Sequence, residues 1–181
     1  TETSLEKLVK DKLSNPLCLP GPTGESNRLS LHGRGVMILI IRGEDPVIAI
    51  TLQIASALLC GCSLLICADK NHGKTVIDIL NRYKALSIPT SMLQTVALED
   101  SASLIQHPDI AGVIANSFGT NSSALRQELA KRSGPIIPLI EWPKINADYN
   151  YHWLLGFLSE RTRTENLTAR GGNTQLFNLA E

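Results

Sequence analysis

The side chains of this sequence best suited to nucleophilic or metal chemistry are its cysteines and histidines. Three of the cysteines, Cys60, Cys62 and Cys67, lie in one apolar run that contains no histidine or aspartate. A zinc site needs C-x-x-C pairs or histidines at ligand spacing. The histidines are instead scattered along the chain, at His32, His72, His107 and His152. We therefore predict buried, reduced thiols, histidines at the surface or at helix caps, and no metal site.

Phosphate-binding chemistry is the next possibility, and the segment that would carry it is Arg42-Gly43-Glu44-Asp45-Pro46. A dinucleotide-binding fold has G-x-G-x-x-G between its first strand and first helix. This junction has one glycine and two acids, and acids at a helix N-terminus repel a pyrophosphate. The sequence also contains no Walker loop, H-E-x-x-H or G-x-S-x-G motif. We predict a fold of the nucleotide-binding type without its phosphate-binding chemistry.

The composition limits the possible partners. The chain has 181 residues, of which 43% are hydrophobic and 19% charged, as in a globular domain with a real core. Lysine plus arginine and aspartate plus glutamate number 17 each, and aromatic residues make up only 4%. A neutral chain with few rings lacks the charge and the stacking surfaces of a general nucleic-acid binder. We predict no nucleic-acid partner.

One uncharged stretch, Pro46–Ala68, has about 23 residues and could in principle cross a bilayer. Cys60-Gly61-Cys62 near its end is typical of a helix terminus, and Ser63–Cys67 is typical of a short buried strand. We therefore predict a helix followed by a strand, and no transmembrane segment.

From Val36 onward, apolar strands alternate with helices. Strands are predicted at Val36–Ile41, Ser63–Cys67, Met92–Ala97, Ile110–Ala115 and Pro135–Ile140. Helices are predicted between them, at Pro46–Leu59, Lys74–Lys84, Ser101–Gln106 and Ser122–Lys131. This alternation implies right-handed βαβ crossovers. The predicted fold class is α/β, with a Rossmann-like, mostly parallel sheet, helices on both faces, and an extended C-terminal flap.

The predicted organisation is an N-terminal helix over 1–15, an ordered Pro/Gly-rich connecting segment over 16–35, a degenerate Rossmann-like domain over 36–142, a linker and helix over 143–163, and a flap over 164–181. Within the connecting segment, the prolines and glycines of Leu19–Asn27 argue against helix or regular strand. The helix after the linker is predicted at Tyr151–Leu158. The chain begins at Thr1, as expected of a piece of a longer polypeptide, although processing would look the same.

Two segments resemble the aldehyde dehydrogenase family. Ala57–Ala68 is similar to its stretch ALAAGNTVVLKP, and Ser133–Trp142 is similar to GPIVPLIAETGG of glutamate-semialdehyde dehydrogenases. The resemblance implies that Cys67 replaces the lysine that holds the cofactor's ribose, and that Trp142 replaces the general-base glutamate. Glu141 is one residue early, and on a strand it would point to the opposite face. The family's nucleophilic cysteine belongs to a separate catalytic domain. We therefore expect no catalytic residue and no cofactor site in this chain.

Two further segments resemble proline utilization A enzymes. Leu19–Asn27, LPGPTGESN, is similar to a segment that follows their aldehyde dehydrogenase module. Glu160–Asn173 resembles their C-terminal motif, with Arg170 in place of an alanine. The resemblance implies a cytoplasmic bifunctional parent with an FAD-dependent proline dehydrogenase module and an NAD-dependent glutamate semialdehyde dehydrogenase module, with peripheral membrane association of the parent as a further option. This chain would be neither module. Such a domain packs on the semialdehyde dehydrogenase, and its tail covers the cavity that channels the intermediate.

The residues expected at that interface or in the lid share a place in the two segments similar to proline utilization A. They are Leu19, Pro20, Gly21, Pro22, Thr23, Gly24, Asn166, Gly171, Gly172, Asn173 and Leu176. A rigid surface loop and a simple β-turn are the alternative interpretations of the two segments. A contact of the flap with a second copy, as in a homodimer, is another option. The alternative function is a degenerate nucleotide-binding or regulatory domain.

Overall fold

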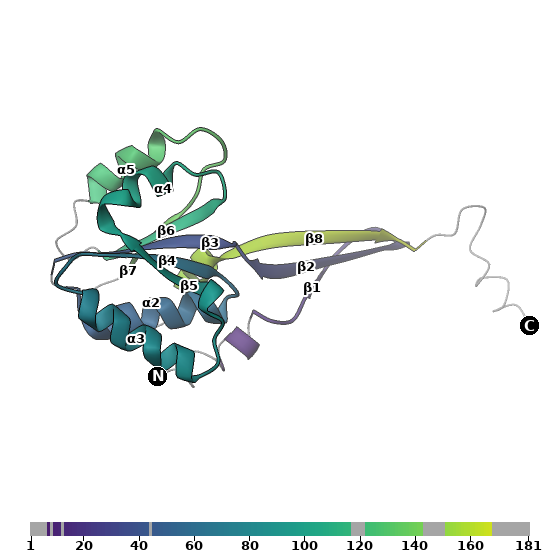
Figure 1. Ribbon diagram of the computed structural model, residues 1–181. Coiled ribbons are helices and arrows are strands. Elements are labelled where there is room, and N and C mark those ends of the chain that lie inside the picture. Colours follow the sequence, from purple (N-terminus) through teal and green to yellow (C-terminus); the bar gives the residue numbers. More distant parts are fainter. Residues whose placement is uncertain are drawn as a thin grey trace, which may run out of the picture.

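The computed structural model describes residues 7, 9–11, 13–43, 45–116, 122–142 and 151–167. These residues form two sheets, which Figure 1 shows as a body and a projecting arm. The body is a five-stranded parallel sheet with the strand order β5-β4-β3-β6-β7. The arm is a three-stranded antiparallel sheet with the order β1-β2-β8. The predicted fold class, α/β with a mostly parallel sheet, is confirmed.

The parallel sheet is built around its central strand, β3 (Val36–Ile41). Every residue from Met37 to Ile41 is buried, as expected of a strand covered on both faces. Three other strands have bounds close to those predicted: β4 (Ser63–Ala68), β5 (Leu93–Ala97) and β6 (Ile110–Asn116). The edge strand is β7 (Leu139–Trp142).

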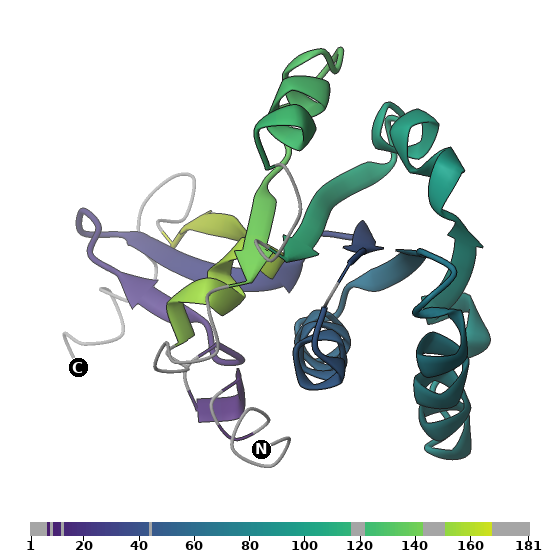
Figure 2. The same ribbon diagram turned by 90° about the vertical axis from the view of Figure 1, so that its left-hand side faces the viewer.

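Helices cover both faces of this sheet, as predicted (Figure 2). One face carries α2 (Val47–Leu59) and α3 (Gly73–Ala85), and the other carries α4 (Ser101–Ile105) and α5 (Ser122–Ala130). Pro46 precedes the first turn of α2, where a missing N–H costs nothing. The uncharged stretch thus forms a helix and a strand, and none of the helices in the described part of the chain is long and apolar enough to cross a membrane.

The last strand of the sheet differs from its prediction. A strand was expected at Pro135–Ile140, but β7 begins only at Leu139. Proline lacks the N–H that a sheet ladder requires, and prolines occupy positions 135 and 138. The carbonyl of Pro138 still accepts a hydrogen bond from the nitrogen of Val113, at 2.9 Å.

The arm consists of β1 (Leu17–Leu19), β2 (Glu25–Gly33) and β8 (Leu158–Asn166). All nine residues of β2 pair with all nine of β8, from Glu25 opposite Asn166 to Gly33 opposite Leu158. The prediction of an irregular segment over Leu19–Asn27 is therefore wrong at both ends, because Leu19 ends β1 and the last three residues belong to β2. The prediction holds for the turn between β1 and β2, where the prolines lie.

That turn is compact. The nitrogen of Glu25 donates to the carbonyl of Pro22 at 3.2 Å, and Gly24 has φ 89°, which favours glycine. The side-chain nitrogen of Asn27 would lie 2.3 Å from a Cβ at Gly21. Pro20 and Pro22 are confined to this turn, so no ladder hydrogen bond is lost.

The arm joins the body at Gly33. A Cβ at Gly33 would lie 2.5 Å from the carbonyl oxygen of Gly61 and 2.6 Å from that of Cys60. Next along the chain, the nitrogen of Arg34 donates to the carbonyl of Phe157 at 3.0 Å. The same carbonyl accepts from the thiol of Cys62 at 3.2 Å. The root of the arm is thus fixed to the turn between α2 and β4.

The helix expected at Tyr151–Leu158 is a 3-10 helix, η3 (Tyr151–Phe157), and Leu158 already belongs to β8. The expected linker and helix over 143–163 therefore ends in a strand. Leu154 and Phe157 are fully buried, and Trp153 packs edge-on against Phe157 at 5.3 Å between ring centroids. Burial of these side chains holds the short helix against the sheet.

Most of the predicted N-terminal helix and of the C-terminal flap lies outside the described residues. Lys7 and 9–11 are helical, and Leu13 is buried in the core. Two short 3-10 helices complete the fold, η1 (Thr90–Met92) and η2 (Leu98–Asp100).

Candidate functional site

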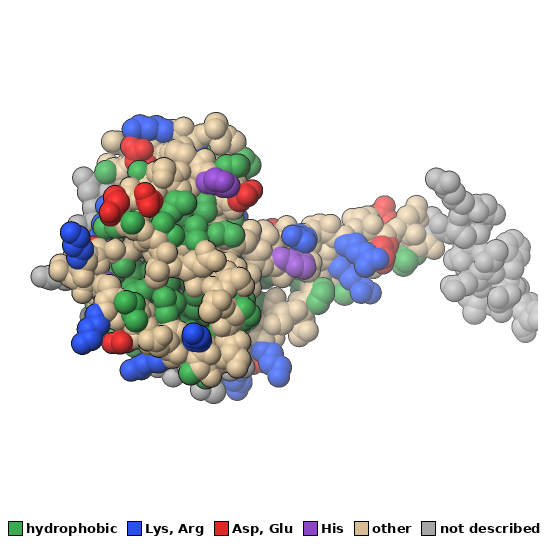
Figure 3. Space-filling view, in the orientation of Figure 1, with side chains coloured by type: hydrophobic (Ala, Val, Ile, Leu, Met, Phe, Trp, Pro, Cys, Tyr) green, Lys and Arg blue, Asp and Glu red, His purple; other side chains and the backbone are tan. Residues whose placement is uncertain are grey.

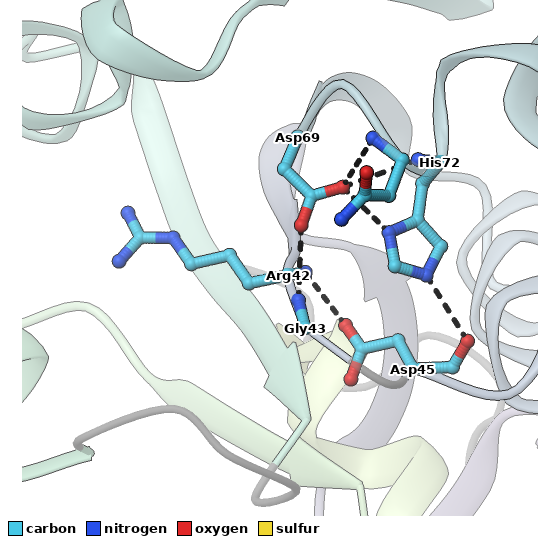
Figure 4. Close-up of polar contacts among 6 residues, drawn as sticks. Arg42, Gly43, Asp45, Asp69 and His72 are labelled. Carbon is cyan, nitrogen blue, oxygen red and sulfur yellow. Dashed lines mark hydrogen bonds and ion pairs between the residues drawn. The ribbon is translucent and has the colours of Figure 1, made fainter.

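In open α/β sheets, ligands bind at the carboxyl ends of the strands, near the point where the strand order reverses. Here the strand order reverses between β3 and β6, and the loop after β6 lies outside the described residues. The loop after β3 borders this point, and the loop after β4 lies beside it. Figure 4 shows Arg42, Gly43 and Asp45 from the loop after β3, and Asp69 and His72 from the loop after β4. Their polar contacts decide what this end of the sheet can bind.

The carboxylate of Asp69 connects the two loops (Figure 4). Its Oδ2 accepts a hydrogen bond from the nitrogen of Gly43 at 3.0 Å. Its Oδ1 accepts from the backbone nitrogens of Asn71 and His72, both at 3.1 Å, and lies 2.7 Å from Nδ1 of His72. Backbone N–H groups at such a strand-to-helix junction would otherwise be the donors for a phosphate. In this chain a side chain of the protein itself accepts from them.

The ionised form of Asp69 is favoured. Burial on its own would raise the pKa of Asp69, but hydrogen bonds from His72 and from the backbone of Gly43, with the charge of His72, outweigh it and lower the pKa. The side chain therefore carries a negative charge at neutral pH, next to the N-terminus of α3. A second anion at this position would meet repulsion from that charge.

Asp45 and Glu44 were expected to face a bound phosphate. For Asp45 this expectation is wrong. Asp45 is buried, and its Oδ2 accepts from the backbone nitrogen of Arg42 at 2.9 Å. Its Oδ1 is buried without a hydrogen-bond partner among the described residues. Glu44 lies outside the described residues. The acid that engages the loop donors is Asp69, which the sequence analysis did not single out.

His72 was expected at the surface or at a helix cap, and it is the N-cap residue of α3. It is buried, and its Nε2 lies 3.3 Å from the carbonyl oxygen of Asp45. The signal that could have revealed it is local: an aspartate directly after a strand, three residues before a histidine that begins a helix. His32 and His107 are exposed, as predicted, and the side chain of His152 lies outside the described part.

Cys67 is fully buried in the core on the α4 and α5 face, so the side chain at this position reaches no ligand. Burial raises its pKa to about 11, with Arg42 lowering and Asp100 raising it in smaller measure. The pKa of Cys60 is raised to about 12 by burial and then by the nearby Cys62, whose own pKa burial also raises. The predicted buried, free thiols are confirmed. A thiol with a raised pKa is a poor nucleophile.

The expected general-base position lies on β7. Glu141 forms an ion pair with Arg126 of α5, so this carboxylate is engaged with a helix on one face of the sheet. Trp142 is part of β7 and pairs with Asn116, while its side chain lies outside the described atoms. In the described part of the chain, no group of three or more metal-ligating side chains comes together.

The predicted interface residues come together at the tip of the arm. Leu19 ends β1, and 20–24 form the turn. Asn166 pairs with Glu25 just beyond the turn, and the nitrogen of Leu167 donates to the carbonyl of Gly24 at 2.7 Å. Residues far apart in the sequence thus share one exposed structure. Gly171, Gly172, Asn173 and Leu176 lie outside the described residues.

One face of the arm is rich in leucine and threonine. Leu17 of β1 pairs with Leu29 of β2, which pairs with Thr162 of β8. Residues directly opposite in an antiparallel sheet project from the same side, so these side chains form one row. Leu17 is 59% exposed. We call this row, Leu17, Leu29 and Thr162, the apolar row of the arm.

Comparisons with known proteins agree with this fold. No family model matches the chain. Aminoaldehyde dehydrogenase 1, peroxisomal, of Pisum sativum is 24% identical over 159 residues, which cover 82% of this chain and 31% of that protein.

Among solved structures, a proline utilization A mutant from Bradyrhizobium japonicum superposes with a TM-score of 0.66 at 31% identity, covering 77% of this chain and 14% of that one. A bifunctional proline utilization A superposes with a TM-score of 0.64 at 33% identity and the same coverage. An NAD-dependent benzaldehyde dehydrogenase from Corynebacterium glutamicum, 19% identical with a TM-score of 0.61, covers 78% of this chain and 33% of its own, and shares the fold.

The parallel sheet, its paired helices and the projecting arm therefore define a domain of the aldehyde dehydrogenase superfamily, to which the chain belongs. Within that superfamily it resembles part of proline utilization A. The chain spans 14% of the length of those proline utilization A chains and about a third of the pea enzyme, at 31%. The resemblance predicted from the motifs is confirmed at this level.

Proposed function

We propose that the chain is a non-catalytic domain of a cytoplasmic bifunctional enzyme that oxidises proline to glutamate. It packs on the NAD-dependent glutamate semialdehyde dehydrogenase module of the same polypeptide and helps to cover the cavity that channels the aldehyde. FAD and NAD belong to the catalytic modules of that enzyme. The observation that carries the proposal is the projecting arm (Figure 1), in which Leu17 and Thr162 of the apolar row are exposed and Leu29 between them is half-buried.

The arm supports docking for an energetic reason. A leucine buried in an interface stabilises it by about 1.5–3 kcal/mol relative to its exposed state. Leu17 and Leu167 are both more than half exposed. A ribbon that holds such side chains away from its own core is suited to burying them against a partner.

The carboxyl end of the sheet supports the absence of catalysis. Asp69 accepts hydrogen bonds from the backbone nitrogen of Gly43 and from that of His72, the residue before the first turn of α3. Cys67 is buried where the family has its ribose-binding lysine. Glu141 is held by Arg126. Electrostatics and burial therefore oppose cofactor binding here, and fold alone does not imply an active site.

A degenerate nucleotide-binding or regulatory domain is the alternative function. It requires an anion or ribose site at the same end of the sheet, and the charge of Asp69 disfavours one. We therefore favour the docking function.

An association experiment tests the proposal. The chain is mixed with the separately produced semialdehyde dehydrogenase module of the same polypeptide, and complex formation is followed by sedimentation velocity. We expect a one-to-one complex, weakened roughly tenfold or more by Leu17→Glu, since this change puts a charge into the apolar row. The matched control is Leu86→Glu at the end of α3, where the leucine is 67% exposed. Absence of a complex, or equal weakening by both variants, would contradict docking through the arm.

A further inference from the structure

The face of the arm opposite the apolar row carries arginines. Arg28 of β2 lies directly across from Arg163 of β8. Arg161 is two residues from Arg163 on the same strand, so it projects from the same face. All three are exposed, and blue side chains are visible along the arm in Figure 3. We call these three residues the cationic face.

One carboxylate, that of Glu165, shares this face with the three arginines. Arg163 forms an ion pair with Glu165. Within the described residues, no carboxylate forms an ion pair with Arg28 or Arg161. The strands of the arm hold three arginines and three glutamates, but Glu25 and Glu160 alternate onto the opposite face, so positive charge is in excess on the cationic face alone. Like charges directly opposite destabilise an antiparallel pair, so the arrangement costs the isolated arm stability.

We propose that the cationic face binds an acidic protein surface, on which carboxylates meet the guanidinium groups of Arg28, Arg161 and Arg163. Guanidinium groups bind carboxylates through two parallel N–H bonds. The spacing of the three arginines fits carboxylates about 5 Å apart across the strands and about 7 Å apart along β8. The identification of this partner with the semialdehyde dehydrogenase module rests on the proposed function; the preference for carboxylates does not.

The arm fits a protein better than a nucleic acid or a membrane. Its three strands contain no phenylalanine, tyrosine or tryptophan on which a base could stack. Its opposite face carries leucines suited to a protein interface. Three arginines in one short row are few for the many phosphate contacts on which non-specific nucleic-acid binding depends.

The test uses the whole chain and three anionic probes: hexaglutamate, a twenty-nucleotide single-stranded DNA, and vesicles containing anionic phospholipid. Affinities are measured by titration calorimetry at low and at physiological salt. The variant R28Q/R161Q/R163Q removes the cationic face. The matched control is K70Q/K74Q/K84Q, which removes the same formal charge at exposed positions on and near α3.

We expect hexaglutamate binding that weakens about tenfold in the arginine variant and less than about twofold in the lysine control. Thermal unfolding of both variants checks that they are folded. Equal losses in the two variants would mean general attraction to a basic protein and would overturn the proposal. Tighter binding of the DNA or the vesicles than of hexaglutamate at the same salt would overturn it as well. Neither outcome bears on docking by the apolar row, which the sedimentation experiment tests separately.

Discussion

The carboxylate Oδ2 of Asp69 lies 3.0 Å from the backbone nitrogen of Gly43, and this contact joins the loop after β4 to the loop after β3. The loop after β3 borders the point where the strand order reverses, which is where open α/β sheets bind ligands. The carboxylate supplies the acceptor that a ligand would otherwise supply. Asp69 therefore has two roles that can be tested independently, one in stability and one in excluding anions.

Replacing Asp69 by asparagine tests the role in stability. D69N keeps the shape but loses the charge that favours contacts with Gly43 and His72, and we expect a loss of about 1–2 kcal/mol in the free energy of unfolding. The folded-state pKa of Asp69 is lowered, so its stabilisation is full above the unfolded value of about 3.9 and is lost as pH falls through the folded pKa. Urea unfolding between pH 2 and pH 7 measures both. The exposed Asp109, changed to asparagine, is the control, and equal effects of the two changes would contradict this role.

The role in excluding anions predicts that the chain binds neither NAD nor NADP with useful affinity. A pyrophosphate at this site would have to displace Asp69 from Gly43 and from the backbone of His72. Calorimetric titration at neutral pH, with an NAD-dependent aldehyde dehydrogenase as positive control, measures the affinity. Saturable binding tighter than about 100 μM, roughly 5.5 kcal/mol, would show that the site accepts a cofactor despite the carboxylate.

The root of the arm depends on a glycine with no room for a side chain. Gly33→Ala would place a methyl group 2.5 Å from the carbonyl oxygen of Gly61, which is rigid backbone. We expect a loss of about 1–3 kcal/mol in unfolding free energy. Gly73→Ala is the matched control, because a Cβ there meets nothing within 4 Å. Thermal unfolding compares the two variants, and similar midpoints would show that the arm can shift to relieve the clash.

The cysteines should differ sharply in reactivity. Cys18 is exposed on β1, whereas Cys60, Cys62 and Cys67 are buried. Burial raises the pKa of all three buried thiols, so their thiolate fraction at pH 8 is far below that of an ordinary cysteine. Mass spectrometry after brief alkylation should find one label on the native chain and four after denaturation. Rapid labelling of a second cysteine in the native chain would contradict the packing described for these thiols.

The parallel sheet could be predicted from the sequence because its signals are local. Apolar β-rich runs such as Val36–Ile41 alternate with helices that begin at a proline or end at a glycine, and those patterns do not depend on distant residues. The arm could not be predicted in this way. Its strand β2 pairs with β8, more than a hundred residues away, and the polar sequence of β8 after Leu158 has no apolar alternation to reveal it.

In the candidate site, too, the features that depend on local sequence could be predicted and those that depend on tertiary contacts could not. The replacement of a lysine by Cys67 and the position of Glu141 followed from motif alignment. In the structure Cys67 is fully buried and Glu141 forms an ion pair with Arg126. The contacts of Asp69 depend on how the loops after β3 and β4 approach each other. That approach is a tertiary property, so an aspartate in a polar loop gave no distinguishing signal.

The most direct test of the central claim is a deletion in the complete polypeptide that carries this chain. Removing residues from Thr164 onward takes away the last paired residues of β8 at the tip of the arm, opposite Glu25–Asn27, together with the predicted flap. Proline dehydrogenase and glutamate semialdehyde dehydrogenase activities are then measured separately. Because the domain is proposed to cover only the aldehyde module, we expect the semialdehyde dehydrogenase activity to fall while the proline dehydrogenase activity stays nearly unchanged. Normal semialdehyde oxidation and normal coupled flux in the truncated enzyme would contradict the covering role, and a parallel fall in both activities would indicate a folding defect instead.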